Sequence, residues 1–309
     1  MNRSPRVVVV GSANVDLTTF TDQFPRPGET IFGKNFHLGF GGKGANQAFA
    51  ACRCGAEVTM VARVGDDLFG QATLDNFASA GIETRHVLIT PGVSSGVAPI
   101  FVDSTGQNRI LVVKGANDRL SPSDVDAAAD VIRQSDFVIL QLEIPLETVF
   151  HTLQLAHALG VRSILNPAPG HVLDFDRLKT ADFVIPNETE AETMTGFPVS
   201  NSTEVDACAR FMLDEGLRQV IITLGANGSL HATSQKITRV PAFDVTAIDS
   251  TGAGDAFIGS LACFLAEGLS ESDAMSRANL YAALSTLTIG TQKSFVTRDR
   301  FEAEWAKRS

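Results

Sequence analysis

The chain has 309 residues, of which 44% are hydrophobic and 19% are charged. This length is sufficient for a large buried core, in one big domain or in two smaller ones. The formal net charge is −10, which argues against general nucleic-acid binding, because proteins of that class carry a basic face. An anionic substrate stays compatible with this charge, because a small site can be locally positive.

No apolar stretch reaches the roughly 18 residues that a membrane-spanning helix needs, so we expect no membrane association. The basic N-terminus leads into a short apolar run at 7–10, which predicts a first strand rather than a signal peptide. The cysteines are too few and too scattered for a disulfide framework, and reduced thiols fit a cytoplasmic protein. They are Cys52, Cys54, Cys208 and Cys263.

Strand and helix patterns alternate along most of the chain. Short apolar runs predict strands at 6–11, 58–65, 136–143, 162–167, 182–187 and 219–225. Helical patterns occupy 44–55, 69–81 and 145–160, and the region after residue 253 is mostly helical. This alternation predicts an α/β fold of βαβ units, in which helices flank a central, mostly parallel, Rossmann-like sheet.

Two segments break this rhythm. Residues 17–40 alternate polar and apolar side chains between prolines and glycines, and residues 95–114 are typical of a hairpin with its turn at 103–108. We expect them to pair as antiparallel strands in a small β-lid outside the main sheet. With neither a low-complexity linker nor an internal repeat, we treat 1–309 as a single domain.

Polar side chains follow several predicted strands at the point where each strand ends. Asn14 and Asp16 follow the first strand, Glu143 ends another, and Asn187 and Glu190 end a third. Residues of these types often form turns or helix N-caps. Because ligands of open α/β sheets bind beyond the carboxyl ends of the strands, several at one sheet edge favour a site.

The glycine-rich stretch GFGGKGANQA, at 39–48, leads into a helix. It is not a P-loop, since Gly44 follows Lys43 and the Walker spacing is absent. Glycines would let the backbone approach a ligand closely, and Lys43 and Asn46 would then bind hydroxyls or phosphate oxygens. The alternative is a flexible turn with a solvated lysine.

The stretch DSTGAGDAF, at 249–257, places glycines where a helix begins near Ala253. A helix start offers unpaired N–H groups and a positive dipole end, and glycines leave room for an anion. Asp255 in the first turn would suit a general base beside such an anion hole. An ordinary acidic N-terminal turn explains the motif equally well on its own.

Taken together, these motifs resemble those of the ribokinase (PfkB) carbohydrate kinases. GGKGANQA (41–48) is similar to the first family motif and DSTGAGDAFIG (249–259) to the second. The stretches 166–169, 186–196 and 222–228 fall in the expected order, so the resemblance covers essentially the whole chain.

The resemblance implies in-line transfer of the γ-phosphoryl group of ATP to the O5 hydroxyl of a pentose. Asp255 would be the catalytic base, and the amides of Gly252, Ala253 and Gly254 would form the anion hole. The residues implied to hold the sugar are Asn14, Asp16, Gly42, Lys43, Asn46, Glu143 and Asp255.

The resemblance also implies nucleotide and metal sites. ATP would lie along Asn187, Thr223, Gly225, Gly228, Gly254 and Asn279. Asn187 and Glu190 would organise Mg²⁺ through waters, as Mg²⁺ keeps several waters and few carboxylates. A K⁺ ion would lie beside the anion hole at Asp249, Thr251, Ser285, Thr288, Gly290 and Ser294. The β-lid would cover the sugar and pair two subunits into a homodimer.

The sequence favours D-ribose as the sugar and leaves 2-deoxy-D-ribose as the alternative. Segments 94–117 and 290–294 look more like the deoxyribokinase branch, whose members tend to carry an apolar residue where Asn14 stands. Asn14 would bond a sugar hydroxyl, and such a site rejects the analogue that lacks it. A non-catalytic sensor on the same fold is the remaining alternative, against which the retained Asp255 and its glycines argue.

Overall fold

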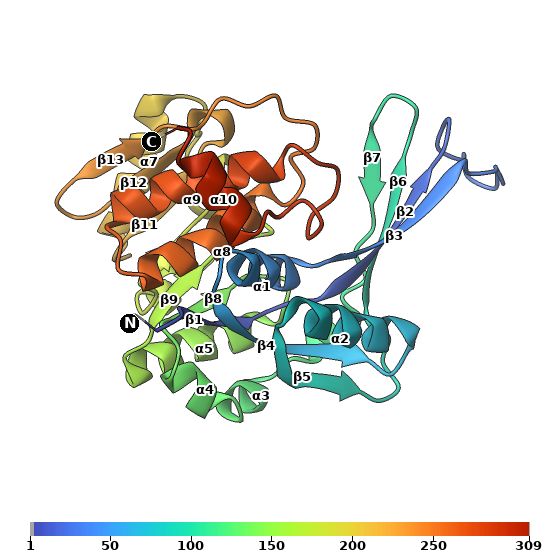
Figure 1. Ribbon diagram of the computed structural model, residues 1–309, viewed down its shortest axis with the longest axis horizontal. Coiled ribbons are helices and arrows are strands. Elements are labelled where there is room, and N and C mark those ends of the chain that lie inside the picture. Colours follow the sequence, from blue (N-terminus) through green and yellow to red (C-terminus); the bar gives the residue numbers. More distant parts are fainter. Residues whose placement is uncertain (1–2, 309) are drawn as a thin grey trace.

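The computed structural model describes residues 3–308, in which helices lie on both faces of one large sheet and a second, small sheet projects to one side (Figure 1). Over these residues the large sheet has the strand order β13-β12-β11-β10-β9-β8-β1-β4-β5. All pairings from β5 to β11 are parallel, and β12 and β13 are antiparallel. This confirms the predicted α/β architecture.

The strands of the large sheet are β1 Arg6–Val10, β4 Glu57–Gly65, β5 Glu83–Thr90, β8 Phe137–Leu140, β9 Arg162–Leu165, β10 Phe183–Val184, β11 Val220–Thr223, β12 Ser229–Ala232 and β13 Ile237–Val240. β8 is shorter than predicted, because Leu142 N leaves the ladder and donates to Ala168 O at 2.9 Å. Glu143 therefore lies in the loop beyond this strand.

The helices are α1 Lys43–Arg53, α2 Leu68–Ala80, α3 Pro122–Asp126, α4 Ala129–Arg133, α5 Leu146–Leu159, α6 Glu188–Thr195, α7 Ser202–Asp214, α8 Ala253–Ala266, α9 Glu271–Ser285 and α10 Arg298–Trp305, with short 3₁₀ turns η1 Gly115–Arg119, η2 Phe175–Leu178 and η3 Gly225–Asn227. None of the helices within 3–308 is both long and apolar enough to cross a membrane.

The core lies on both faces of the large sheet. Val7 and Val9 of β1 join a buried cluster with α1, α2, α8, α9 and α10, whereas Val8 and Val10 join a second cluster with α3 to α7. This division follows from the pleat, because successive side chains of a strand point to opposite faces. Strands buried on both faces explain the continuous valine run.

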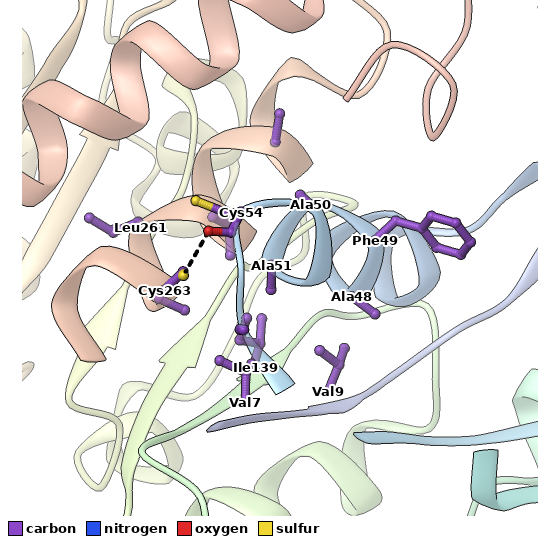
Figure 2. Packing of buried hydrophobic residues seen from close by; sticks show 14 of the residues in the cluster. Val7, Val9, Ala48, Phe49, Ala50, Ala51, Cys54, Ile139, Leu261 and Cys263 are labelled. Atoms are coloured by element: carbon purple, nitrogen blue, oxygen red, sulfur yellow. Dashed lines mark hydrogen bonds between the residues drawn. The ribbon is translucent and has the colours of Figure 1, made fainter. Parts of the chain in front are cut away.

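On the first face, α1 and α8 approach each other closely. A Cβ at Gly259 of α8 would lie 2.4 Å from Gln47 O and 2.8 Å from Ala51 N, so only glycine allows this approach. At the other end of α1, the Cys263 thiol donates to Cys54 O at 3.5 Å (Figure 2). The two helices that begin with the glycine-rich motifs are thus packed directly on each other.

The small sheet consists of β2 Asn14–Phe20, β3 Asn35–Gly41, β6 Gly96–Val102 and β7 Asn108–Ile110, in the order β3-β2-β6-β7. We call these four strands the lid. The predicted small sheet outside the main sheet is present, and each segment pairs within itself as antiparallel strands, but the expected antiparallel pairing between the two segments is wrong, because β2 and β6 pair in parallel. The lid extends away from the helical body (Figure 1).

Candidate active site

The residues predicted to bind the sugar and to form the anion hole gather where the strand order reverses. The chain builds β4 and β5 on one side of β1 and β8 to β11 on the other. The loops after β1 and β8 and the first turns of α1 and α8 meet there. Open α/β sheets bind ligands at the carboxyl ends of strands at such a point.

The start of α8 is an open helix N-terminus. Gly252 precedes the helix with a φ of 79°, a conformation that favours glycine. A Cβ at Gly254 would meet no atom within 4 Å. Among the described residues, the amides of Gly252 and Gly254 have no hydrogen-bond partner, whereas Ala253 N donates to Ser250 O at 3.1 Å. Free N–H groups at a helix N-terminus attract anions.

Asp255 lies in the first turn of α8 and is buried. Its Oδ2 accepts from Asn46 Nδ2 at 3.0 Å and its Oδ1 accepts from Gln47 Nε2 at 2.9 Å. Burial raises the pKa of Asp255 above its ordinary value, although Lys43 and the two amide donors oppose this shift. The site therefore holds an oriented carboxylate with enhanced proton affinity beside free backbone amides.

Lys43 and Glu143 form a second part of the site. Glu143 Oε2 accepts from Ser12 Oγ at 2.6 Å and from the backbone N of Lys43 at 3.0 Å. Burial lowers the pKa of Lys43, but the carboxylates of Asp255, Glu143 and Glu190 outweigh it and raise the pKa above the ordinary value. Lys43 is thus a firmly charged cation among acids.

Asn14 and Asp16 enter the site from β2. Asn14 is buried, and its Oδ1 accepts from Asn117 Nδ2 at 2.7 Å. Burial, with a contribution from Glu143, raises the pKa of Asp16 to about 6. A Cβ at Gly41 would lie 2.4 Å from Asp16 Oδ2, and one at Gly42 would lie 2.7 Å from Asn14 N. The two glycines of the first motif therefore make room for these side chains and their backbone.

Asn187 and Glu190 cap α6. Asn187 Oδ1 accepts from Glu190 N at 2.8 Å, and Glu190 Oε2 accepts from Asn187 N at 2.9 Å. This reciprocal pair is a capping box, so both residues also serve as the helix N-cap that the sequence analysis gave as the other explanation. Glu190 Oε1 has no hydrogen-bond partner among residues 3–308. Burial raises the pKa of Glu190 despite these bonds. Within residues 3–308, no group of three or more His, Cys, Asp or Glu side chains is arranged so that it could hold a metal ion.

The other predicted nucleotide residues lie along β11 and its following turn. Thr223 ends β11 and bridges to Asn187, and a Cβ at Gly225 would meet open space. Packing explains the glycine at position 228, because a Cβ there would lie 2.1 Å from Val240 O. Asn279 Nδ2 donates to Val240 O and Pro241 O, each at 3.1 Å, and so ties α9 to the loop after β13.

Asp249 joins two of the predicted cation-binding loops. Its Oδ1 accepts from Thr251 N and its Oδ2 from Gly290 N, each at 2.9 Å. Burial raises the pKa of Asp249, but these bonds outweigh it and hold the pKa below the ordinary value. The hydroxyls of Ser285 and Ser294 donate to backbone carbonyls, which leaves their oxygens available as acceptors. Thr288 makes no side-chain hydrogen bond with any residue of 3–308.

Several site residues carry no role in the sequence analysis. Gln47 contacts Asp255 directly, and its spacing of four from Lys43 places it on the same helix face. Gln141 and Asn166 lie at strand ends, where polar residues already indicate a site. Asn117 has no sequence signal, yet it fixes the Ala13–Asn14 backbone by accepting from Ala13 N at 2.9 Å.

The family model of pfkB family carbohydrate kinases matches residues 4–298. The chain belongs to the pfkB family of carbohydrate kinases. It is 45% identical to a deoxyribokinase of Salmonella typhi over 96% of this chain and 97% of that protein. It is 40% identical to a mouse ribokinase over 94% of this chain and 91% of that protein.

The fold is also that of solved relatives. A structure of Arabidopsis thaliana ribokinase complexed with ribose and ATP superimposes with a TM-score of 0.89 at 28% identity, covering 97% of this chain and 98% of that chain. The predicted family, fold and sugar-kinase activity are confirmed, and the chain is a carbohydrate kinase.

Proposed function

We propose that this carbohydrate kinase transfers the γ-phosphoryl group of ATP to the O5 hydroxyl of D-ribose, giving ribose 5-phosphate and ADP. The observation that carries the proposal is the pairing at the start of α8 of a buried carboxylate, Asp255, with free backbone amides. Proton removal and stabilisation of negative charge are the two tasks of this transfer.

Asp255 takes the proton from the O5 hydroxyl as that oxygen attacks the γ-phosphorus. Its raised proton affinity helps, because a base buried away from water accepts a proton more readily. The amides of Gly252 and Gly254 donate to the charge that develops on the phosphoryl oxygens. Ala253 completes this turn, with its own amide bonded to Ser250 O.

The sugar lies between the lid and the first turn of α1. Asp16, Glu143 and the Asn14 amide present acceptors and donors at fixed positions, and Lys43 adds a cation. A buried polyol requires such an arrangement, because each unpaired hydroxyl costs free energy. The residues assigned to the sugar are Asn14, Asp16, Gly42, Lys43, Asn46, Glu143 and Asp255.

ATP would lie over β11 and η3, along Asn187, Thr223, Gly225, Gly228, Gly254 and Asn279. Asn187 and Glu190 would hold Mg²⁺ through waters, and the ion would neutralise phosphate charge when bound. Asp249, Thr251, Ser285, Thr288, Gly290 and Ser294 would hold K⁺, with Asp249 as the fixed negative charge. We place the reaction in the cytoplasm, which keeps the free cysteines reduced.

The second candidate substrate is 2-deoxy-D-ribose, favoured by the higher identity to a deoxyribokinase, 45% against 40% for the mouse ribokinase. Asn14 argues for ribose. Its Oδ1 is occupied by Asn117, so its amide N–H groups are the part left to bond a sugar hydroxyl. A site built to bond a hydroxyl discriminates against the analogue that lacks it.

The test is ADP release with Mg²⁺ and K⁺ over ribose, 2-deoxyribose, fructose and adenosine. We expect ribose to give the highest kcat/KM, and Asn14→Met to shift the ratio toward 2-deoxyribose. A higher kcat/KM for 2-deoxyribose in the wild type would select the second candidate. Ligand binding without any sugar-dependent ADP release would favour the non-catalytic sensor.

We also propose that two subunits pair through the lid. Phe36, Phe101 and Ile110 on the lid are 59%, 41% and 54% exposed. Large apolar side chains that gather on one projecting sheet are typical of an association surface. Such pairing would close the lid over the sugar and exclude water, whose attack on ATP is the competing reaction.

A further inference from the structure

A chain of buried amide side chains lies behind Asp255. Gln47 is fully buried, and its Nε2 lies 2.9 Å from Asp255 Oδ1 and 3.2 Å from Asn166 Oδ1. Gln47 Oε1 accepts from Gln141 Nε2 at 2.6 Å. Each polar atom of the Gln47 side chain therefore has a partner.

These partners fix the orientation of the Gln47 amide. Its two N–H groups face two acceptors, the carboxylate of Asp255 and the carbonyl of Asn166. The Asn166 amide is oriented in turn, because its Nδ2 donates to Ile185 O at 2.9 Å. A rotated Gln47 amide would turn its carbonyl oxygen against the carboxylate, which is repulsive. The side chain thus has one favourable state.

Gln141 supports this state at a cost in stability. It is fully buried, and its Oε1 has no hydrogen-bond partner in the described chain. The oxygen packs against Gly11, where a Cβ would lie 2.0 Å away. A buried acceptor without a partner destabilises a protein, so an apolar residue would serve packing better. The useful part of Gln141 is the amide that it donates to Gln47.

We propose that Gln47, backed by Gln141, is a positioning residue that holds the Asp255 carboxylate in the orientation required for proton removal. The assignment rests on the function proposed above for Asp255. Gln47 donates a hydrogen bond to Asp255 Oδ1 and Asn46 donates one to Asp255 Oδ2. One bond on each oxygen fixes the plane of the carboxylate. The remaining acceptor positions of the carboxylate are then aimed at the sugar hydroxyl.

The bond from Gln47 also favours the ionised form of the base. Lys43 from α1, Glu143 from the loop after β8 and Glu190 from α6 are the charged groups that face Asp255. Burial and Glu143 raise the pKa of Asp255, and Lys43, Asn46 and Gln47 lower it. Without the Gln47 donor, the pKa of Asp255 rises further. The fall of kcat at low pH, which we call the acid limb of the pH profile, therefore moves to higher pH.

The test compares Gln47→Leu and Gln141→Leu with wild type under saturating sugar and ATP. For Gln47→Leu we expect kcat to fall about 10- to 100-fold, the sugar KM to change less than about threefold, and the acid limb to shift upward. For Gln141→Leu we expect the same signs with a smaller loss, and a Tm close to that of wild type, because the unpartnered oxygen of Gln141 is removed while Gln47 Oε1 loses its donor.

The matched control is Gln219→Leu. Gln219 lies just before β11, at the opposite end of the sheet from the site, and bonds His231 Nε2 at 2.9 Å. We expect this variant to keep the wild-type acid limb and the wild-type kcat.

If Gln47→Leu fails to fold, the result for Gln141→Leu tests the positioning role instead. An unmoved acid limb in the folded variants, or a raised KM with kcat intact, would overturn the assignment. A wild type without sugar-dependent ADP release would instead refute the proposed function, and this assignment with it.

Discussion

The floor of the site and the lid are built in opposite ways. In the floor, α1 and α8 meet through a glycine, and the polar side chains that they carry are buried and hydrogen-bonded to one another. In the lid, four strands project from the body and expose large apolar side chains, with Phe36 59% exposed. We therefore propose that the floor holds the reacting groups in place, and that the lid buries its exposed apolar side chains by pairing with a second subunit.

The difference has a physical reason. A base must lie within a fraction of an ångström of its position, which a packed, hydrogen-bonded core provides. A cover must open to admit the sugar, so it cannot share that core. We therefore expect changes in the floor to lower kcat and changes in the lid to act mainly on sugar binding and association.

The largest expected effect is that of Asp255→Asn. The amide cannot take the sugar proton, so we expect kcat to fall about 10²- to 10⁴-fold, with the sugar dissociation constant nearly unchanged. Steady-state rates and calorimetric sugar binding measure the two quantities. Asp214→Asn at the exposed end of α7 is the control. A variant that kept more than a tenth of the wild-type kcat would remove Asp255 from the role of base.

The next largest effect is that of Gly259→Val, which tests the α1–α8 contact. The new side chain would meet the backbone of Gln47 and Ala51, so the two helices must separate. We expect about 1–3 kcal/mol of destabilisation together with a loss of roughly 10-fold or more in kcat. Thermal unfolding and ADP release measure both. Ala266→Val, at the end of the same helix, should cost stability without a comparable loss of kcat.

A moderate effect is expected from pH. Asp16 must be ionised to accept bonds from sugar hydroxyls, and burial raises its pKa to about 6. The carboxylate form is lost as the pH falls through this value, so kcat/KM for the sugar should drop roughly tenfold between pH 7 and pH 5. Asp16→Asn should give a higher KM and a weaker dependence near pH 6. A wild-type profile that stays flat down to pH 5 would contradict this role.

The smallest effect on turnover is expected from the lid. The double change Phe36→Ser and Ile110→Ser removes exposed apolar surface and should dissociate the proposed dimer. We expect kcat to stay within about threefold, because the floor is untouched, and the sugar KM to rise. Sedimentation velocity and steady-state kinetics follow the two outcomes. A wild type that is already monomeric at micromolar concentration would rule out pairing through the lid.

Sequence patterns predict much of the fold and of the candidate site, and the remaining features depend on how distant segments pack together. The valine run of β1 predicts a strand buried on both faces, and the glycines before Asp255 predict an open helix start. The order of the motifs, rather than any single one, identified the family. The treatment of 1–309 as a single domain stays a prediction.

Other features depend on contacts between distant segments. Asn117 reaches Asn14 across a separation of 103 residues, and Gln47 reaches Asp255 across 208. No local pattern encodes such pairs. The prediction that the two lid segments pair in antiparallel fashion was wrong, because alternation along a strand indicates neither which neighbour it takes nor in which direction.

The most direct test of the account is the position of phosphate on the product formed from ribose and ATP. One- and two-dimensional ³¹P–¹H NMR of the reaction mixture identifies the carbon that bears the phosphoester. The account predicts phosphorus coupled to the two protons on C5 of ribose, formed one for one with ADP, and formed at least about 100-fold more slowly with Asp255→Asn. Phosphate on another carbon, or ADP release without phosphorylated sugar, would contradict it.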